Sequence, residues 1–259
     1  MGRDKVIIGE FLRGLNEHLG ASFRITDLPD ELERQKQAVD VIAQDERGQT
    51  LAVEHTLIQP FVGEKDDSVR FRAAIGPLEA DTSLRIPGKS VDLCVPVGAI
   101  PKRRECGEVP AKVVDWFRRV RPSLPVGRSD HNVPGLGFDL TVHVDMDESA
   151  HPEGGIYVAR SGMPQGFDCV VGRALEDKLP KLAAARADKR ILLFEKDNLP
   201  HGYVEICKIL DSLGGGLPDL LKIDEVWVVN TVSWASGGGL FFYRVWPGGI
   251  TDKFRVGSD

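Results

Sequence analysis

Residues 37–59 read QAVDVIAQDERGQTLAVEHTLIQ, two short strand-like runs on either side of a tight turn at residues 46–48. Each run carries one carboxylate in an apolar setting, because Asp40 lies between two valines and Glu54 follows Leu-Ala-Val. Burial in a strand normally excludes such charges. Both acids lie seven positions from Arg47, so an antiparallel hairpin centred on this turn places them opposite each other on one face of a sheet.

Two neighbouring carboxylates repel each other unless they share a proton or bind a cation. Hard divalent cations such as Mg²⁺ and Mn²⁺ favour oxygen ligands of this kind. The hairpin therefore predicts a metal site at Asp40 and Glu54. The residues leave a structural alternative open, in which the two acids form a buried ion pair or a hydrogen-bonded pair with Arg34, Lys36 or His55.

The chain has 259 residues, of which 42% are hydrophobic, enough for a substantial core in one large domain or two small ones. Its formal net charge of -6 argues against a protein that holds nucleic acid mainly by a global positive field. Basic residues cluster locally at residues 102–104 and 118–121. Such runs are ordinarily solvated faces.

The cysteines and the apolar runs bear on the compartment. Four widely spaced cysteines form no CxxC pair, which disfavours a zinc knuckle and is typical of reduced thiols in the cytosol; they are Cys94, Cys106, Cys169 and Cys207. The N-terminal segment is too charged for a signal peptide. No run approaches the roughly 20 apolar residues of a membrane span. We therefore expect a soluble, cytoplasmic protein.

The pattern of apolar residues predicts a helix at residues 5–19, with Gly20 as its C-cap, and a weak strand at residues 22–26 before the hairpin. The last third of the chain favours helices at 173–187 and 203–213 and strands at 191–194, 225–232 and 240–246. We expect residues 1–59 and 171–259 to form an α/β core, a mixed central sheet flanked by helices. Residues 60–170 are expected to form an insertion or a small subdomain, with strands at 91–97, 138–145 and 156–160 and a helix at 111–120.

This order, a helix bearing Glu10, three strands with an acid on the second and third, then a helix and the buried strand ILLF, resembles the PD-(D/E)XK nuclease superfamily. The resemblance covers residues 5–59 and 173–197. It implies a restriction-endonuclease-like core with a large insertion. It also implies that Asp40 matches the first-motif Asp, that Glu54 matches the acid of the second motif, and that Glu10 is the frequent extra metal-binding Glu of the first helix.

The sequence departs from this family at two positions. Val39 stands where the family has Pro, and Thr56 stands where the second motif has Lys. Side chains alternate along a strand, so Glu54 and Thr56 share a face while His55 points away. A threonine hydroxyl supplies no positive charge. In some divergent members the lysine comes from the following helix, and Lys178 is the candidate.

Helical geometry gives Lys178 some support. The predicted inward stripe is Leu175, Leu179 and Leu182, with Lys178 at its edge and Lys181 pointing further out. Pro180 would kink this helix or mark its first turn.

The resemblance implies metal-assisted hydrolysis of a phosphodiester in nucleic acid. Asp40, Glu54 and a main-chain carbonyl near position 55 would hold one or two Mg²⁺ or Mn²⁺ ions. Lys178 would position the attacking water or help to deprotonate it. Two other classes stay open: a nuclease-like fold without chemistry that serves as a binding or assembly module, which Thr56 favours, and an unrelated α/β protein whose acids only stabilise the sheet.

A second group of candidate ligands lies in the sequence TVHVDMD. His143, Asp145 and Asp147 share one strand face, and His151 follows just beyond. Such a set is able to bind a metal, but the turn-like composition around it favours a solvated polar face.

Overall fold

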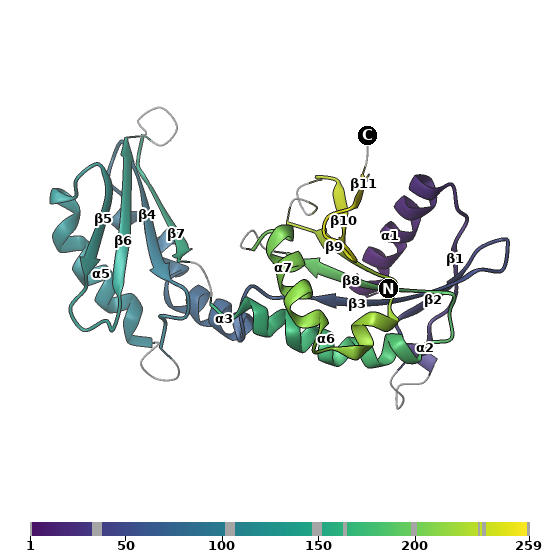
Figure 1. Ribbon diagram of the computed structural model, residues 1–259. Helices are drawn as coiled ribbons and strands as arrows, with labels where there is room; N and C mark the ends of the chain where they lie inside the picture. The colour runs from purple at the N-terminus through teal and green to yellow at the C-terminus, as the bar shows by residue number, and fades with distance from the viewer. Residues whose placement is uncertain are drawn as a thin grey trace. The chain divides into compact units, whose positions relative to one another are not determined.

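The computed structural model describes residues 2–32, 38–101, 107–146, 152–162, 165–197, 201–232, 234 and 237–257. The chain divides into two compact units (Figure 1). The first unit comprises residues 1–62 and 165–259, and the second comprises residues 63–164. The sequence analysis placed these two boundaries at residues 59/60 and 170/171.

The first unit is built on a seven-stranded sheet of order β1-β2-β3-β8-β9-β10-β11. Its central strands β3, β8 and β9 are parallel, and the other neighbours are antiparallel. The α/β class, with a mixed central sheet flanked by helices, is thus confirmed. The strand bounds are β1 Arg24–Asp27, β2 Val41–Gln44, β3 Thr50–Leu57, β8 Lys189–Lys196, β9 Glu225–Asn230, β10 Leu240–Trp246 and β11 Asp252–Val256.

Helices cover both faces of this sheet. Helix α1 (Arg3–Leu19) packs on one face, where Phe11 lies among Val53 and Trp227. Helices α6 (Phe167–Ala184) and α7 (Tyr203–Gly214) pack on the other face (Figure 1). The short segments α2 (Pro29–Leu32) and the 3-10 helix η4 (Pro218–Lys222) complete the unit.

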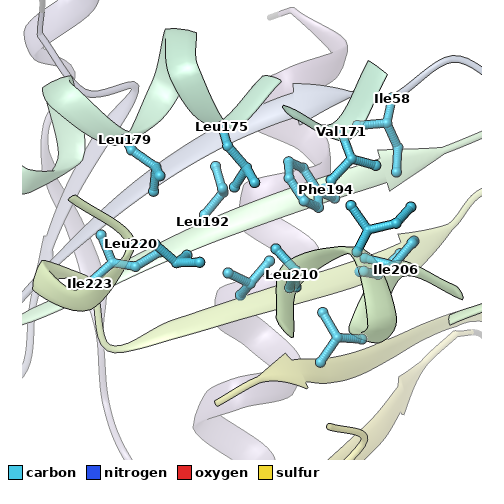
Figure 2. Close-up of a cluster of buried hydrophobic side chains, with 14 of the residues drawn as sticks. Ile58, Val171, Leu175, Leu179, Leu192, Phe194, Ile206, Leu210, Leu220 and Ile223 are labelled. Atoms are coloured by element: carbon cyan, nitrogen blue, oxygen red, sulfur yellow. The ribbon is translucent and has the colours of Figure 1, made fainter. Parts of the chain in front are cut away.

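Strand β3 is buried on both faces, as expected for the middle of a parallel sheet. Its even-numbered residue Ala52 belongs to the α6 and α7 core, and its odd-numbered residues Leu51 and Val53 belong to the α1 core. Figure 2 shows Leu175 of α6 beside Leu192 of β8 in the first of these cores. Side chains on even positions of β3 therefore face α6.

The second unit has its own four-stranded sheet of order β5-β6-β4-β7 and its own buried core. Its strands are β4 Lys89–Pro96, β5 Gly127–Asn132, β6 Asp139–Met146 and β7 Gly155–Ser161. Its helices are α3 Glu64–Ala74, α4 Pro77–Ala80 and α5 Val109–Val120, with 3-10 turns η1 Thr82–Leu84 and η3 Arg121–Ser123.

Several expectations about the chain can be placed on this fold. Within the described ranges, no helix is long and apolar enough to cross a membrane. Cys94, Cys169 and Cys207 are free thiols. Cys106 and the basic residues 102–104 lie outside the described residues.

Candidate functional site

The hairpin forms in the predicted register. Val41 pairs with Val53 and Ile42 with Ala52. Extended by one residue, this register places Asp40 opposite Glu54. The main-chain N–H of Asp40 donates to Glu54 Oε2 at 3.1 Å, and the main-chain N–H of His55 donates to Asp40 Oδ2 at 2.7 Å. The two carboxylates are thus tied to each other's strands.

Lysine side chains from α6 reach the same carboxylate. Lys178 Nζ donates to Glu54 Oε1 at 2.8 Å, and Lys181 Nζ lies 3.6 Å from the same oxygen. Glu54 is 0% exposed, and each lysine side chain is 18% exposed. The structure therefore brings Lys178 to the acids. The expectation that Lys181 points further out was wrong, because residues three apart lie on one side of a helix.

The proline in this helix does not end it. Pro180 lies inside α6, which continues to Ala184. Proline removes one N–H from the helical ladder, but Leu179 and Leu182 on either side remain in the core. The packing of the leucine stripe holds both lysines over β3.

Burial raises the pKa of both carboxyl groups. For Glu54 the negative charge of Asp40 raises the pKa further, against the opposing effects of Lys178 and Lys181. For Asp40 the hydrogen bond from His55 and the charge of Lys178 only partly offset burial. Although burial lowers the pKa of Lys178, its hydrogen bond and attraction to Glu54 raise it overall. The raised pKa values of the two acids thus come first from burial, which the lysines offset only in part.

Glu10 is not brought to these acids. Its carboxylate pairs with Arg13 Nη2 at 2.5 Å on α1. Helix α1 covers the face of Val53, whereas Glu54, one residue on, faces α6. The expectation of Glu10 as a metal ligand finds no support in this geometry, because the sheet separates the two faces.

His55 anchors a second polar cluster on the α1 face. His55 Nε2 lies 3.1 Å from Glu195 Oε2, while Glu195 Oε1 accepts from Arg3 Nε at 2.9 Å and from Thr231 Oγ1 at 2.8 Å. Glu195 is 1% exposed. Burial raises its pKa, but the hydrogen bonds from His55, Thr231 and Arg3 outweigh this and leave the pKa lowered.

The sequence analysis missed this cluster. Its signal was Glu195, the acid that directly follows the apolar run ILLF and lies one residue before the end of a buried strand. The imidazole of His55 thus contacts Glu195 on the α1 side of β3. The main-chain N–H of the same residue donates to the carboxylate of Asp40. Two of the structural partners considered for the acids, Arg34 and Lys36, lie outside the described residues.

The second candidate group is partly described. His143 Nδ1 lies 3.6 Å from Asp145 Oδ2 and 3.9 Å from Asp92 Oδ2 on β6 and β4. All three side chains are more than 40% exposed, as a solvated polar face requires. Asp147 and His151 lie outside the described residues.

The acids at Asp40 and Glu54 stand as a pair. Among the residues that the structure describes, no three His, Cys, Asp or Glu side chains gather closely enough to hold a metal ion by themselves. Comparison with known proteins adds no further ligand or relative. No family model, no curated protein and no solved structure matches this chain.

Proposed function

We propose that this protein is a metal-dependent phosphodiesterase that hydrolyses nucleic acid at Asp40, Glu54 and Lys178. The observation that carries the proposal is the contact of Lys178 Nζ with Glu54 Oε1 at 2.8 Å. It supplies from α6 the positive charge that Thr56 lacks on β3. Two acids on paired strands and a lysine beside them are the groups that metal-assisted hydrolysis uses.

The donor set fits a magnesium or manganese ion. Mg²⁺ keeps several waters and is commonly held by one or two carboxylates, so two acids are sufficient. The raised pKa values of Asp40 and Glu54 mark negative charge that burial makes unfavourable, and a divalent cation held by these residues would relieve it. When bound, the ion supplies Lewis acidity and lowers the pKa of a coordinated water.

The chain's own groups have separate tasks in this proposal. The N–H of His55 fixes the orientation of the Asp40 carboxylate. Lys178 keeps its proton, because its pKa is raised, so it orients water and phosphate as a cation and does not act as the base. A water oxygen attacks phosphorus and loses its proton to solvent, while the bond to the leaving sugar oxygen breaks and that oxygen takes up a proton from solvent.

The PD-(D/E)XK resemblance belongs to the same proposal. The order α1, β1, β2, β3, α6, β8 follows the helix, three strands, helix, strand of that superfamily, with residues 63–164 inserted between β3 and α6. The acids lie on the second and third of these strands or at their ends. This order supports a restriction-endonuclease-like core.

A second function has one observation in its favour. Thr56 occupies the lysine position of the second motif, and both carboxylates already accept hydrogen bonds from the main chain. A fold of this kind that has lost its chemistry would serve as a binding or assembly module.

Metal binding and cleavage measured together test the proposal. Calorimetry with Mg²⁺ and Mn²⁺ is compared for the wild type, the double variant Asp40→Asn with Glu54→Gln, and the control Asp211→Asn at an exposed position of α7. We expect binding and cleavage of mixed nucleic acids to be lost only in the double variant. Binding without cleavage would favour the module, and no binding by the wild type would reject the metal site.

A further inference from the structure

A groove of about 260 Å³ lies against β2 and the C-terminal half of α6. Its apolar lining includes Val39, Ile42 and Ala184, and its charged lining consists of Lys181 and Arg186. An apolar surface with a few placed charges is the usual composition of a small-molecule site.

Lys181 connects this groove with the acids. Its ammonium lies 3.6 Å from Glu54 Oε1 and also lines the groove. Val39, on the opposite wall, directly precedes Asp40. A ligand in the groove therefore adjoins the position where a phosphate would meet Asp40 and Glu54.

The groove is suited to an anion. No acid is among the described residues that line it, and no described side chain pairs with Arg186. A neighbouring hollow at the start of α1 has the opposite character, since Asp4, Asp30 and Glu31 line it beside a single lysine. In a chain of net charge -6, the Lys181 and Arg186 groove is a local basic site next to a buried acidic pair.

We propose that this groove binds an unpaired nucleotide adjoining the scissile phosphate. The side chains of Val39, Ile42 and Ala184 contact its base or sugar, and Lys181 and Arg186 contact its phosphate. This inference rests on the proposed function and deepens it. A base inside a duplex is stacked on both sides and unable to lie against such a wall, so the substrate is single-stranded nucleic acid or a frayed end.

The test measures nucleotide binding without cleavage. Full-length protein carrying Asp40→Asn is titrated with a labelled oligothymidine, which dTMP, ribose 5-phosphate and inorganic phosphate then displace. Two groove variants are compared in this background: Lys181→Gln with Arg186→Gln, and Ala184→Trp, which fills the groove without changing charge. Lys208→Gln, an exposed lysine on α7, is the charge control, and thermal unfolding checks that each variant is folded.

We expect the double charge variant and Ala184→Trp each to weaken binding about tenfold or more, equivalent to at least one good contact, and Lys208→Gln to leave it unchanged. We also expect dTMP to displace the oligonucleotide better than ribose 5-phosphate or phosphate. Equal weakening by Lys208→Gln would overturn the groove in favour of a diffuse charge effect. Equal displacement by ribose 5-phosphate would overturn contact with the base.

Cleavage by the protein with its native Asp40 separates this inference from the proposed function. If Asp40 and Glu54 are needed for cleavage but groove variants bind and cleave normally, the nuclease proposal stands and the groove inference is rejected. If groove variants lose nucleotide binding while the wild type cleaves nothing, the groove stands and the chemistry is rejected.

Discussion

The ionised forms of Asp40 and Glu54 each cost this fold stability. Two carboxylates face each other beside a buried strand, and the pKa of each is raised. A group whose pKa is raised on folding prefers its neutral form there, so its ionisation at neutral pH destabilises the folded state. Such an arrangement is common where a site serves function before stability.

Asp40→Asn should therefore stabilise the protein. The amide retains an oxygen that accepts the His55 N–H and removes the repulsion with Glu54. We expect a gain of about 1 kcal/mol in the free energy of unfolding near neutral pH, measured by urea denaturation with chelator present. The gain should disappear as pH falls through the raised pKa of Asp40, where the wild type also becomes neutral. A loss of stability at neutral pH would contradict this assignment.

Lys178→Met should have the opposite effect. It leaves the fully buried Glu54 with Lys181 as its remaining cation. We expect a loss of about 1–3 kcal/mol in the free energy of unfolding near neutral pH. The loss should shrink as the pH falls through the raised pKa of Glu54, because Glu54 then takes up a proton. The exposed control Lys208→Met should change little, and a pH-independent loss would point to packing alone.

The sequence predicted this site only in part, for physical reasons. The register of the acids followed from equal spacing about Arg47, because turn position fixes pairing in a hairpin. Lys178 followed from the family resemblance, which takes the missing lysine from the following helix, and the helical period of the nearby leucines supported the choice modestly. The contact between His55 and Glu195 joins residues 140 apart, and local pattern holds no information about such a pair.

Among the elements, α1 is held to the sheet by a close approach at one glycine. A Cβ on Gly14 would lie 2.5 Å from a ring carbon of Phe254 on β11, whereas a Cβ on Gly9 of the same helix meets nothing within 4 Å. Both positions gain helix propensity when glycine becomes alanine. Only Gly14 is in contact with another element.

The two glycines make a matched prediction. Gly9→Ala should stabilise by about 1 kcal/mol through propensity, while Gly14→Ala should destabilise by about 1–3 kcal/mol because the overlap forces α1 away from β11. Chemical denaturation of the two variants measures both. If both substitutions change the free energy of unfolding in the same direction, the close packing of Gly14 against β11 is contradicted.

Elements with strong apolar periods were easier to predict than the polar ones. The strands at 138–145 and 156–160 correspond to β6 and β7, and the helix at 111–120 to α5. Strand β5 was missed because its sequence GRSDHN has no apolar residue to reveal the alternation. Helix α6 begins at Phe167, before the predicted start at residue 173, since Gly172 in its second turn interrupts the apolar pattern.

At the scale of the whole molecule, each of the two units has its own core. Leu93 is buried in the core of residues 63–164, and Leu192 is buried in the other unit. Trp116 belongs to the core of residues 63–164, whereas Trp227 belongs to a core of the other unit. Separate cores allow separate unfolding transitions.

Matched truncations should separate these transitions. Leu93→Ala should lower the free energy of unfolding of the unit of residues 63–164 by about 2–5 kcal/mol. Leu192→Ala should lower that of the other unit by about 2–5 kcal/mol. We expect calorimetry to show two unfolding transitions. Leu93→Ala should lower the midpoint temperature of only one of them. That transition should be the one seen by fluorescence in a variant whose only tryptophan is Trp116. A single transition lowered equally by both variants would mean that the units unfold together.

The insertion between β3 and α6 also sets an order of events during synthesis. Glu54 precedes Lys178 by 124 residues, which a ribosome adding about 5–20 residues per second takes about 6–25 s to make. During this interval the nascent chain carries both acids without the lysines that neutralise them. The site therefore cannot be completed until residues 63–164 have been translated, so a nascent chain that ends before Lys178 has no complete site.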